Sequence, residues 1–335
     1  MKRCYGLLSI LFVCLFVSST MPVSAQTGEV GFSVERIPHV QQTNDRVGYF
    51  DLLVKQDEET TLDVIIHNHA SEDKTFDVKT GNGYTNENGV VMYDQENAIS
   101  DHVSFTDLVT DYEQSVTVAA GESKRVSFVL NSVNGDVDGV ILGGIRVSET
   151  TERQEDAQVG LQNRYEYVIG VVLRTSVKQV RFLPEWQGVN VNQEHHYPHI
   201  AFQVMNASGS ISQDLDVQMT IRSDEQDVTL DHAMEAKLVP YTSTGFRFPL
   251  TKRLDAGTYQ VALTMTERDT GATWTWEDEL VVSEEEAETI RERVEQPIVE
   301  ESSFFGGTWT MSLLALLLTA AFLYIVHLRR KLKTQ

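Results

Sequence analysis

Apolar and polar residues alternate with a period of two through most of the chain between residues 26 and 308. In residues 61–66 every second residue is a large aliphatic one, and the segments 125–130, 200–204 and 259–265 follow the same pattern. This period predicts strands with one buried and one exposed face. Clusters of Gly, Asn and Asp interrupt the strands at short intervals, as expected of turns between antiparallel strands. The pattern therefore predicts an all-β protein.

Each half of this region carries a sequence typical of an immunoglobulin-like β-sandwich. In residues 118–128 an apolar strand, a Gly-containing turn and an alternating strand follow one another. In the second half, Gly257 precedes Tyr259 by two positions at the start of an alternating segment. A tyrosine at this place bonds back to the backbone at the corner of the sheet. We therefore predict two tandem immunoglobulin-like β-sandwich domains.

The predicted domains occupy residues 28–150 and 164–283, with the polar and charged stretch 151–163 as the linker between them. The strand-like segment 165–172 fits the sheet of either domain, so its pairing stays open. Residues 284–308 are rich in Glu and helix formers and show no strand alternation. We expect them to form a short acidic stalk that is partly helical.

Both ends of the chain have the features of membrane segments. At the start, two basic residues precede an apolar run that ends at the small-x-small sequence of residues 23–25, which predicts a signal peptide over 1–25. Residues 309–328 form an apolar stretch long enough to cross ~30 Å of hydrocarbon. Basic residues follow in 329–335, which predicts one transmembrane helix, a cytoplasmic C-terminus and an extracellular, wall-facing body. The alternative, a wall-sorting tail, needs an LPxTG-like motif that the preceding sequence lacks.

The charge of the chain is unevenly distributed. The formal net charge is −22, but residues 26–308 carry all 49 acidic residues and only 21 of the 27 basic ones, a net charge of −28. Such an acidic surface repels phosphate, so we expect no nucleic-acid partner. Both cysteines, Cys4 and Cys14, lie in the predicted signal peptide. The mature chain is therefore expected to have neither disulfides nor thiolate metal sites.

Candidate catalytic and metal-binding sequences are few. The sequence has no phosphate-binding loop and no Gly-x-Ser-x-Gly elbow, and no feature selects a pair of carboxylates for glycoside hydrolysis. His67 and His69 share one strand face without an evident third ligand, and residues 134–139 resemble only the first half of a calcium loop. Trp274 and Trp276 also share a face, which fits core packing or an aromatic platform for sugars. We predict a protein that is not an enzyme and has no cofactor or bound metal.

Several short motifs follow one another between the export signal and the basic tail. They are the strand start 48–52, Asn68 at the end of a strand, the loop with Tyr84, Gly89 and Tyr93, the Gly-rich strand 139–145, the segment 167–170, and, in the second half, 254–259 and 274–276. In this order they resemble the WxL-interacting surface proteins of low-GC Gram-positive bacteria. The resemblance covers nearly the whole chain. It implies a first domain that binds peptidoglycan and a second domain that binds a host or partner protein.

The resemblance further implies a non-catalytic, membrane-anchored adhesin or a scaffold of a surface complex. The expected partners are peptidoglycan for the first domain, and a WxL-type surface protein or a component of the host extracellular matrix for the second. A membrane-tethered structural spacer or a wall-sensing receptor is the alternative. Residues 329–335 are too short a tail for a signalling domain, which weakens the sensory version of that alternative.

Ligand-binding residues are expected in the loops of the first domain. The candidates are Tyr84, Asn86, Asn88 and Tyr93. Their amides suit hydrogen bonds to the hydroxyl and acetamide groups of glycans, and their rings suit stacking on sugar faces. A structural role is the alternative, because Asn and Gly also favour turns.

Overall fold

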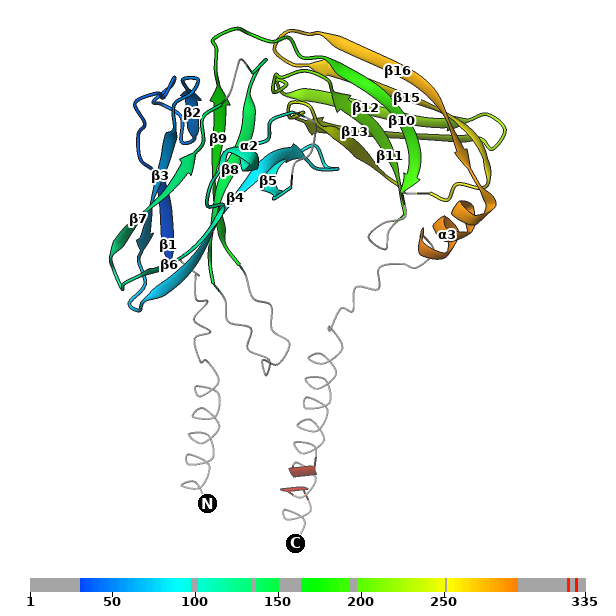
Figure 1. The fold of residues 1–335 in the computed structure, drawn as a ribbon. Helices are drawn as coiled ribbons and strands as arrows, with labels where there is room; N and C mark the ends of the chain where they lie inside the picture. The colour runs from blue at the N-terminus through cyan, green and yellow to red at the C-terminus, as the bar shows by residue number, and fades with distance from the viewer. Residues whose placement is uncertain are drawn as a thin grey trace. The chain divides into compact units, whose positions relative to one another are not determined.

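A computed structural model of the chain describes residues 31–97, 102–133, 137–150, 164–192, 198–250 and 252–294, together with 324–325 and 329–330 (Figure 1). The expected signal peptide, the expected linker and nearly all of the expected transmembrane segment lie outside these residues. Within the described part of the chain, no helix combines the length and the apolar character needed to cross a membrane.

The described residues are mostly β-structure, so the all-β prediction is confirmed. The first half contains β1 (Phe32–Arg36), β2 (Phe50–Leu53), β3 (Thr60–Asn68), β4 (Lys74–Thr85), β5 (Val91–Gln95), β6 (Glu113–Val118), β7 (Ser123–Leu130), β8 (Ile141–Glu149) and β9 (Glu166–Arg174). The second half contains β10 (Pro184–Asn192), β11 (His199–Asn206), β12 (Leu215–Ser223), β13 (Val228–Ala236), β14 (Ser243–Pro249), β15 (Gly257–Glu267) and β16 (Thr273–Val282). The helices α2 (Phe105–Leu108) and α3 (Glu284–Val294) are short.

Two sheets enclose the hydrophobic core of the first half (Figure 1). One has the strand order β1-β3-β7, and the other, six-stranded sheet has the order β2-β9-β8-β4-β5, with β6 also paired to β4. Strand β3 shows how the period-two pattern builds this core. Leu62, Val64 and Ile66 are completely buried, whereas the residues between them are only half-buried. Each buried aliphatic side chain of this size contributes about 1.5–3 kcal/mol to stability.

Strand β9 belongs to the six-stranded sheet, which answers the open question of where segment 165–172 pairs. It runs antiparallel to β8 and parallel to β2. Its buried residues Ile169, Val171 and Leu173 are part of the core between the two sheets. By contacts, the chain divides into a first unit, comprising Met1–Glu185, Met205–Leu215 and Ala236–Thr244, and a second unit, comprising Trp186–Val204, Asp216–Glu235 and Gly245–Gln335. The first unit is therefore discontinuous in sequence.

Two buried asparagines, each at the end of a strand, close loops of the first unit. Asn68 ends β3 and donates from its side-chain amide to three backbone carbonyls, including that of Val118, at 2.8, 3.0 and 3.2 Å. Asn206 ends β11 and donates to two backbone carbonyls, including that of Val239, at 2.7 and 3.2 Å. Each amide oxygen also accepts the backbone N–H two residues later, at 3.0 and 3.1 Å. Both side chains thus satisfy backbone groups at strand ends and in the adjoining loops.

The second half of the chain forms the sheets β10-β11-β14 and β13-β12-β15-β16. Tyr259, near the start of β15, is completely buried, and its hydroxyl donates to the carbonyl oxygen of Asp255 at 2.8 Å. The backbone bond predicted for this tyrosine is therefore confirmed. Trp276 of β16 stacks on Trp186 of β10 with ring centroids 6.4 Å apart, and the Trp186 indole donates to Asp278 at 2.8 Å. Trp276 thus packs at the edge of the two sheets.

The acidic segment after the last strand begins as helix α3. The backbone N–H of Ser283 donates to the carboxylate of Glu286 at 2.8 Å, and the backbone N–H of Glu286 donates to the Ser283 hydroxyl oxygen at 3.3 Å, which forms a capping box at the start of the helix. Ala287 and Ile290 are buried. This part of the expected stalk is therefore packed against protein on one face.

Replacing Asn68 by alanine should lower the free energy of unfolding by about 2–3 kcal/mol, because buried carbonyl groups lose their donor. Urea denaturation of the purified protein, followed by circular dichroism, measures this change. Asn88→Ala is the matched control: Asn88 is exposed, so the expected change is within about 0.5 kcal/mol. An equal effect of both substitutions would contradict the role given to Asn68.

Candidate functional site

Three glycines form a strip without side chains across the face of the six-stranded sheet that is turned away from the core. In the ladders, Gly144 of β8 lies opposite Gly81 of β4 and opposite Gly170 of β9. The next residue of β8, Ile145, is part of the core. Because side chains alternate along a strand, position 144 faces outward. The strip therefore leaves a shallow channel on the outer face of this sheet.

Tyr93 of β5 lies in this channel. A Cβ atom added at Gly144 would lie 2.8 Å from the Tyr93 side chain, and one added at Gly170 would lie 3.4 Å from the Tyr93 hydroxyl and 3.6 Å from Cβ of Tyr49. Tyr93 occupies an irregularity of the β4–β5 ladder, where the register shifts and redirects the strand. Burial, and in addition the neighbouring Tyr49, raise the pKa of Tyr93, so its hydroxyl stays neutral at physiological pH.

A groove of about 620 Å³ opens beside Tyr93. Its apolar and aromatic lining consists of Tyr49, Val91, Tyr93, Leu142, Val168, Val172 and Ile211, and its polar lining consists of Ser212, Gln213 and Lys237. Tyr49 is 41% exposed and Val168 is 45% exposed, so apolar surface is open to solvent here. Concave, mostly apolar surfaces with a few polar groups are typical of ligand sites.

Residues 205–215 and 236–244 of the first unit supply the second wall of the groove. The buried Thr85 hydroxyl donates to the carbonyl oxygen of Lys237 at 2.7 Å and accepts the backbone N–H of Val239 at 3.1 Å. The backbone N–H of Lys237 donates to a carbonyl in the β4–β5 turn at 3.0 Å. The wall is thus hydrogen-bonded directly to the hairpin that carries Tyr93.

Further contacts hold the same wall at the β8 end. The backbone N–H of Val140 donates to the carbonyl oxygen of Gly209 at 2.8 Å. The Tyr241 hydroxyl donates to the carbonyl oxygen of Asp138 at 2.9 Å, and the His102 ring stacks on Tyr241 with centroids 3.6 Å apart. These contacts fix the position of the wall relative to the six-stranded sheet.

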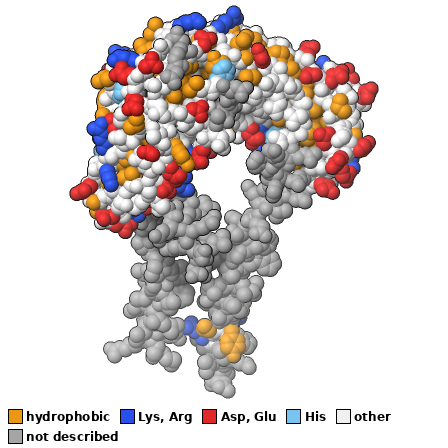
Figure 2. Space-filling view, in the orientation of Figure 1, with side chains coloured by type: hydrophobic (Ala, Val, Ile, Leu, Met, Phe, Trp, Pro, Cys, Tyr) orange, Lys and Arg blue, Asp and Glu red, His pale blue; other side chains and the backbone are white. Residues whose placement is uncertain are grey.

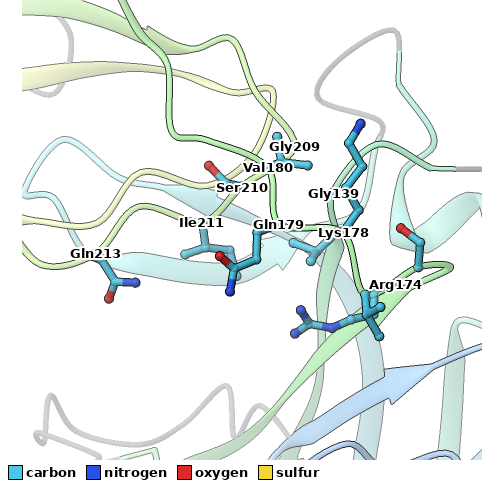
Figure 3. Close-up of a pocket in the computed structure, with 12 residues that line it drawn as sticks. Gly139, Arg174, Lys178, Gln179, Val180, Gly209, Ser210, Ile211 and Gln213 are labelled. Carbon is cyan, nitrogen blue, oxygen red and sulfur yellow. The ribbon is translucent and has the colours of Figure 1, made fainter. Parts of the chain in front are cut away.

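A second pocket, of about 410 Å³, adjoins the groove (Figure 3). Ile211 and Gln213 line both of them. The new pocket is more polar, because Arg174 and Lys178 line it. Arg174 is oriented by Asp51, whose Oδ1 accepts N–H bonds from Nε at 3.0 Å and from Nη2 at 2.5 Å. Both cations of this pocket are ion-paired, Arg174 with Asp51 and Lys178 with Asp138 at 3.3 Å.

The four candidates from the sequence have different surroundings. Tyr84 is half-buried, and burial, followed by a hydrogen bond to Asp94, raises its pKa. The side-chain oxygen of Asn86 accepts two backbone N–H groups of the β4–β5 turn, both at 3.0 Å. Asn88 is exposed in the same turn. Among the four, Tyr93 lines the groove.

Sequence reasoning named Tyr93 alone among the groove residues and missed the others, including Tyr49, Gln213 and Lys237. Tyr49 lies in the strand start 48–52, which carried part of the family resemblance, but nothing in that motif indicates contact with Tyr93. Gln213 and Lys237 lie in the second half of the chain, well beyond β9, the last strand of the first sheet in chain order, which ends at Arg174. No local pattern in a sequence identifies such a contact.

The weaker candidates have ordinary partners. His67 bonds to Ser123 at 2.7 Å and lies 3.3 Å from Glu35, and His69 bonds to a serine of β1 at 2.8 Å. Among the described residues, no group of three or more His, Cys, Asp or Glu side chains could hold a metal ion. Residues 134–136 of the calcium-like sequence lie outside the described part of the chain.

Two family models match the chain in consecutive segments. Residues 32–149 match the model described as WxL Interacting Protein, peptidoglycan binding domain, and residues 156–292 match the model described as WxL Interacting Protein, host binding domain. Together they cover most of the chain. Strand β9 lies in the second of these segments, although it completes the sheet of the first unit.

Similarity to solved structures is weak. The E. coli chaperone DraB is 14% identical over 74% of this chain and 96% of its own, with a TM-score of 0.28. A chain of the CsuC-CsuE chaperone-tip adhesion subunit pre-assembly complex from Acinetobacter baumannii is 10% identical over 68% of this chain and 93% of its own, with a TM-score of 0.31. Scores this low carry no argument about fold or function. No curated protein matches the sequence.

Replacing Gly144 by alanine should push the Tyr93 ring out of the channel, because the new Cβ would lie 2.8 Å from it. We expect the free energy of unfolding to fall by about 1–3 kcal/mol, as for other overpacked sites. Urea denaturation measures this loss. Gly31→Ala serves as the control, since its Cβ would lie 4.0 Å from the nearest side chain, that of Ala70. A Gly144→Ala protein as stable as the wild type would contradict the position of Tyr93.

Proposed function

The chain belongs to the WxL-interacting protein family, and from this premise we propose that it is a non-catalytic surface protein with two binding functions. The first unit binds peptidoglycan. The second half binds a protein, either a WxL-type surface protein or a component of the host extracellular matrix. The chain then acts as an adhesin or as the scaffold of a surface complex. Both matched family models describe binding domains, in agreement with this proposal.

The observation that supports peptidoglycan binding most directly is the groove beside Tyr93. Tyr49 and Tyr93 offer aromatic surface on which the apolar face of a pyranose ring can pack, beside Gly48 and Gly170, which add no side chain to the lining. Gln213 and Lys237 offer hydrogen-bonding groups at the rim for hydroxyl and acetamide groups. A chain of N-acetylated sugars fits this combination of chemistry.

The β4–β5 hairpin contributes the remaining candidates to this proposal. Tyr93 is the contact residue. Asn86 has a supporting role, because its side chain closes the turn that carries Tyr93. Tyr84, which is half-buried, supports the same hairpin. Asn88 lies at its exposed tip.

We further infer that each half of the chain is an immunoglobulin-like sandwich. The facing sheets around the first core and the tyrosine that bonds back to Asp255 support this assignment. The sandwich interior is filled by side chains, so ligands bind on outer faces and loops. The groove has such a position.

A membrane anchor is part of the proposal, because residues 309–328 are apolar and basic residues follow them. After digestion of the cell wall, the protein should remain in the membrane fraction, and a C-terminal tag should be protected from protease added outside intact protoplasts. Immunoblotting of the fractions measures both. Release of the protein into the soluble wall fraction would contradict the anchor.

Tyr49→Ala should weaken binding to purified peptidoglycan about fivefold to tenfold, because an exposed aromatic surface at the centre of the groove is lost. Sedimentation of the full-length protein with purified sacculi measures the fraction bound. Tyr165→Ala is the matched control, since Tyr165 is 46% exposed, close to the 41% of Tyr49. Equal binding by both variants and the wild type would contradict the groove as the binding site.

A further inference from the structure

We propose that the free edge of β16 is a docking site for an extended, basic segment of another protein, which joins the sheet β13-β12-β15-β16 as a further strand. In this mode of recognition, main-chain hydrogen bonds along the edge supply affinity and side chains supply specificity. The inference rests on the proposed function, in which the second half of the chain binds a protein. It adds the surface that is used and the chemistry of the segment that binds there.

Strand β16 is long and regular for the edge of a sheet. Among the described strands it pairs with β15 alone. The ladder between them runs along the whole of β16 without a register shift, from Gly257 opposite Val282 to Thr266 opposite Thr273. Proteins usually protect an edge with Lys, Pro, a bulge or a short strand. The ten residues of β16 include neither Lys nor Pro, so none of these devices protects it.

The other described edges are short, protected or already bonded. Strands β1, β2, β5 and β6 have six residues or fewer. Strand β7 carries the exposed Lys124 and Arg125, β10 contains Gly188 with a φ of 114°, and β14 ends in proline. At β13, the opposite edge of the same sheet, the carboxylates of Asp231 and Glu235 already have a hydroxyl and a guanidinium partner, respectively. These comparisons single out β16.

The phase of the β15–β16 ladder shows which backbone groups face the free edge. The backbone N–H of Glu267 donates to the carbonyl oxygen of Ala272 at 2.8 Å, which fixes the bonded pairs. Along an antiparallel strand, residues alternate between those that bond to the partner strand and those that point away. The N–H of Glu279 donates to the side chain of Asp278 at 2.8 Å, in agreement with an outward direction. The outward-pointing residues of β16 are Thr273, Thr275, Glu277, Glu279 and Val281.

The side chains beside the edge determine the sequence pattern that a partner needs. Those of the outward-pointing residues are exposed on one face of the sheet, where Val281 is 66% exposed. On the other face, the half-buried Trp276 stacks on Trp186 of β10. The side chains of a strand laid along β16 alternate between these two faces. Its polar residues therefore lie beside Glu277, and its apolar residues lie beside the two tryptophans.

Charge selects the partner. Residues 277–279 are three consecutive acids, and residues 273–290 contain seven acidic residues but neither Lys nor Arg. Acidic side chains are also spread over the visible surface (Figure 2). A second copy of β16 is disfavoured, because pairing about the strand centre or in parallel register brings like charges together. A segment with Lys or Arg at alternate positions meets opposite charges instead.

Fluorescence anisotropy with three capped peptides, each ten residues long like β16, tests the proposal on the full-length protein in detergent. The first peptide alternates Lys with Val, the second alternates Glu with Val, and the third is the Lys–Val peptide with N-methylated lysine amides. Lysines on the face of Glu277 turn their N–H groups toward β16, so N-methylation removes these hydrogen bonds and keeps the charge. The Lys–Val peptide should bind about tenfold more tightly than either of the others.

Two variants of β16 assign the binding to its edge. Thr275→Pro removes an outward-pointing N–H and no bond to β15, so it should weaken binding of the Lys–Val peptide about tenfold and lower the melting temperature by less than about 5 °C. Glu277→Lys should weaken the same peptide about fivefold and strengthen binding of the Glu–Val peptide. Glu225→Lys is the matched control and should change neither, because Glu225 is also exposed but lies in the turn between β12 and β13.

Several results would contradict the proposal. Equal binding of the Lys–Val peptide and its N-methylated form would show attraction by charge alone and overturn strand addition, as would wild-type affinity in Thr275→Pro. Equal binding of the Lys–Val and Glu–Val peptides would overturn the basic partner, as would equal losses in Glu277→Lys and Glu225→Lys. Failure of all three peptides to bind would overturn the docking site itself.

A second measurement separates this inference from the proposed function. Surface plasmon resonance compares the wild type with Thr275→Pro on an immobilised WxL-type protein and on collagen. Binding that is lost in Thr275→Pro supports the edge as the docking site. Equal binding by both would overturn the edge and leave the proposed function intact. Binding of the Lys–Val peptide without binding to either protein would overturn the proposed function and leave the edge intact.

Discussion

The candidate site depends on the absence of side chains at three aligned positions of one sheet. Gly81, Gly144 and Gly170 are neighbours in register, and any larger residue at the central position would occupy the volume of the Tyr93 ring. Glycine weakens a strand, because it costs backbone entropy and has no side chain to pack. The aromatic ring of Tyr93 covers the strip and restores part of that packing.

The second wall of the groove depends on an asparagine rather than on a sheet. Asn206 organises residues 206–212 and 238–242 in the manner in which Asn68 organises the corresponding loop of the first half. An asparagine that ends a strand and donates to backbone carbonyls nearby thus occurs twice in the chain. At Asn68 it closes the end of a sandwich, whereas at Asn206 it also holds the polar rim of a ligand groove.

The charge of the whole surface and the charges of individual side chains act over different distances. An acidic surface keeps polyanions and other acidic macromolecules away, and its effect is screened by salt beyond about 8 Å. Beside the groove the cations Arg174, Lys178 and Lys237 each pair with a carboxylate, that of Asp51, Asp138 and Asp214, respectively.

The sequence by itself determined what depends on neighbours along the chain. The alternation around Leu62, Val64 and Ile66 specified a strand and its buried face, and the spacing of Gly257 and Tyr259 specified a sheet corner, because both are set by local geometry. The order of motifs was enough to identify the family. Only the tertiary structure decided that β9 completes the first sheet, that Tyr49 and Tyr93 line the same groove, and that Gln213 and Lys237 form the opposite rim. These contacts join strands and loops far apart in sequence, and the pairing of strands depends on packing that no local period encodes.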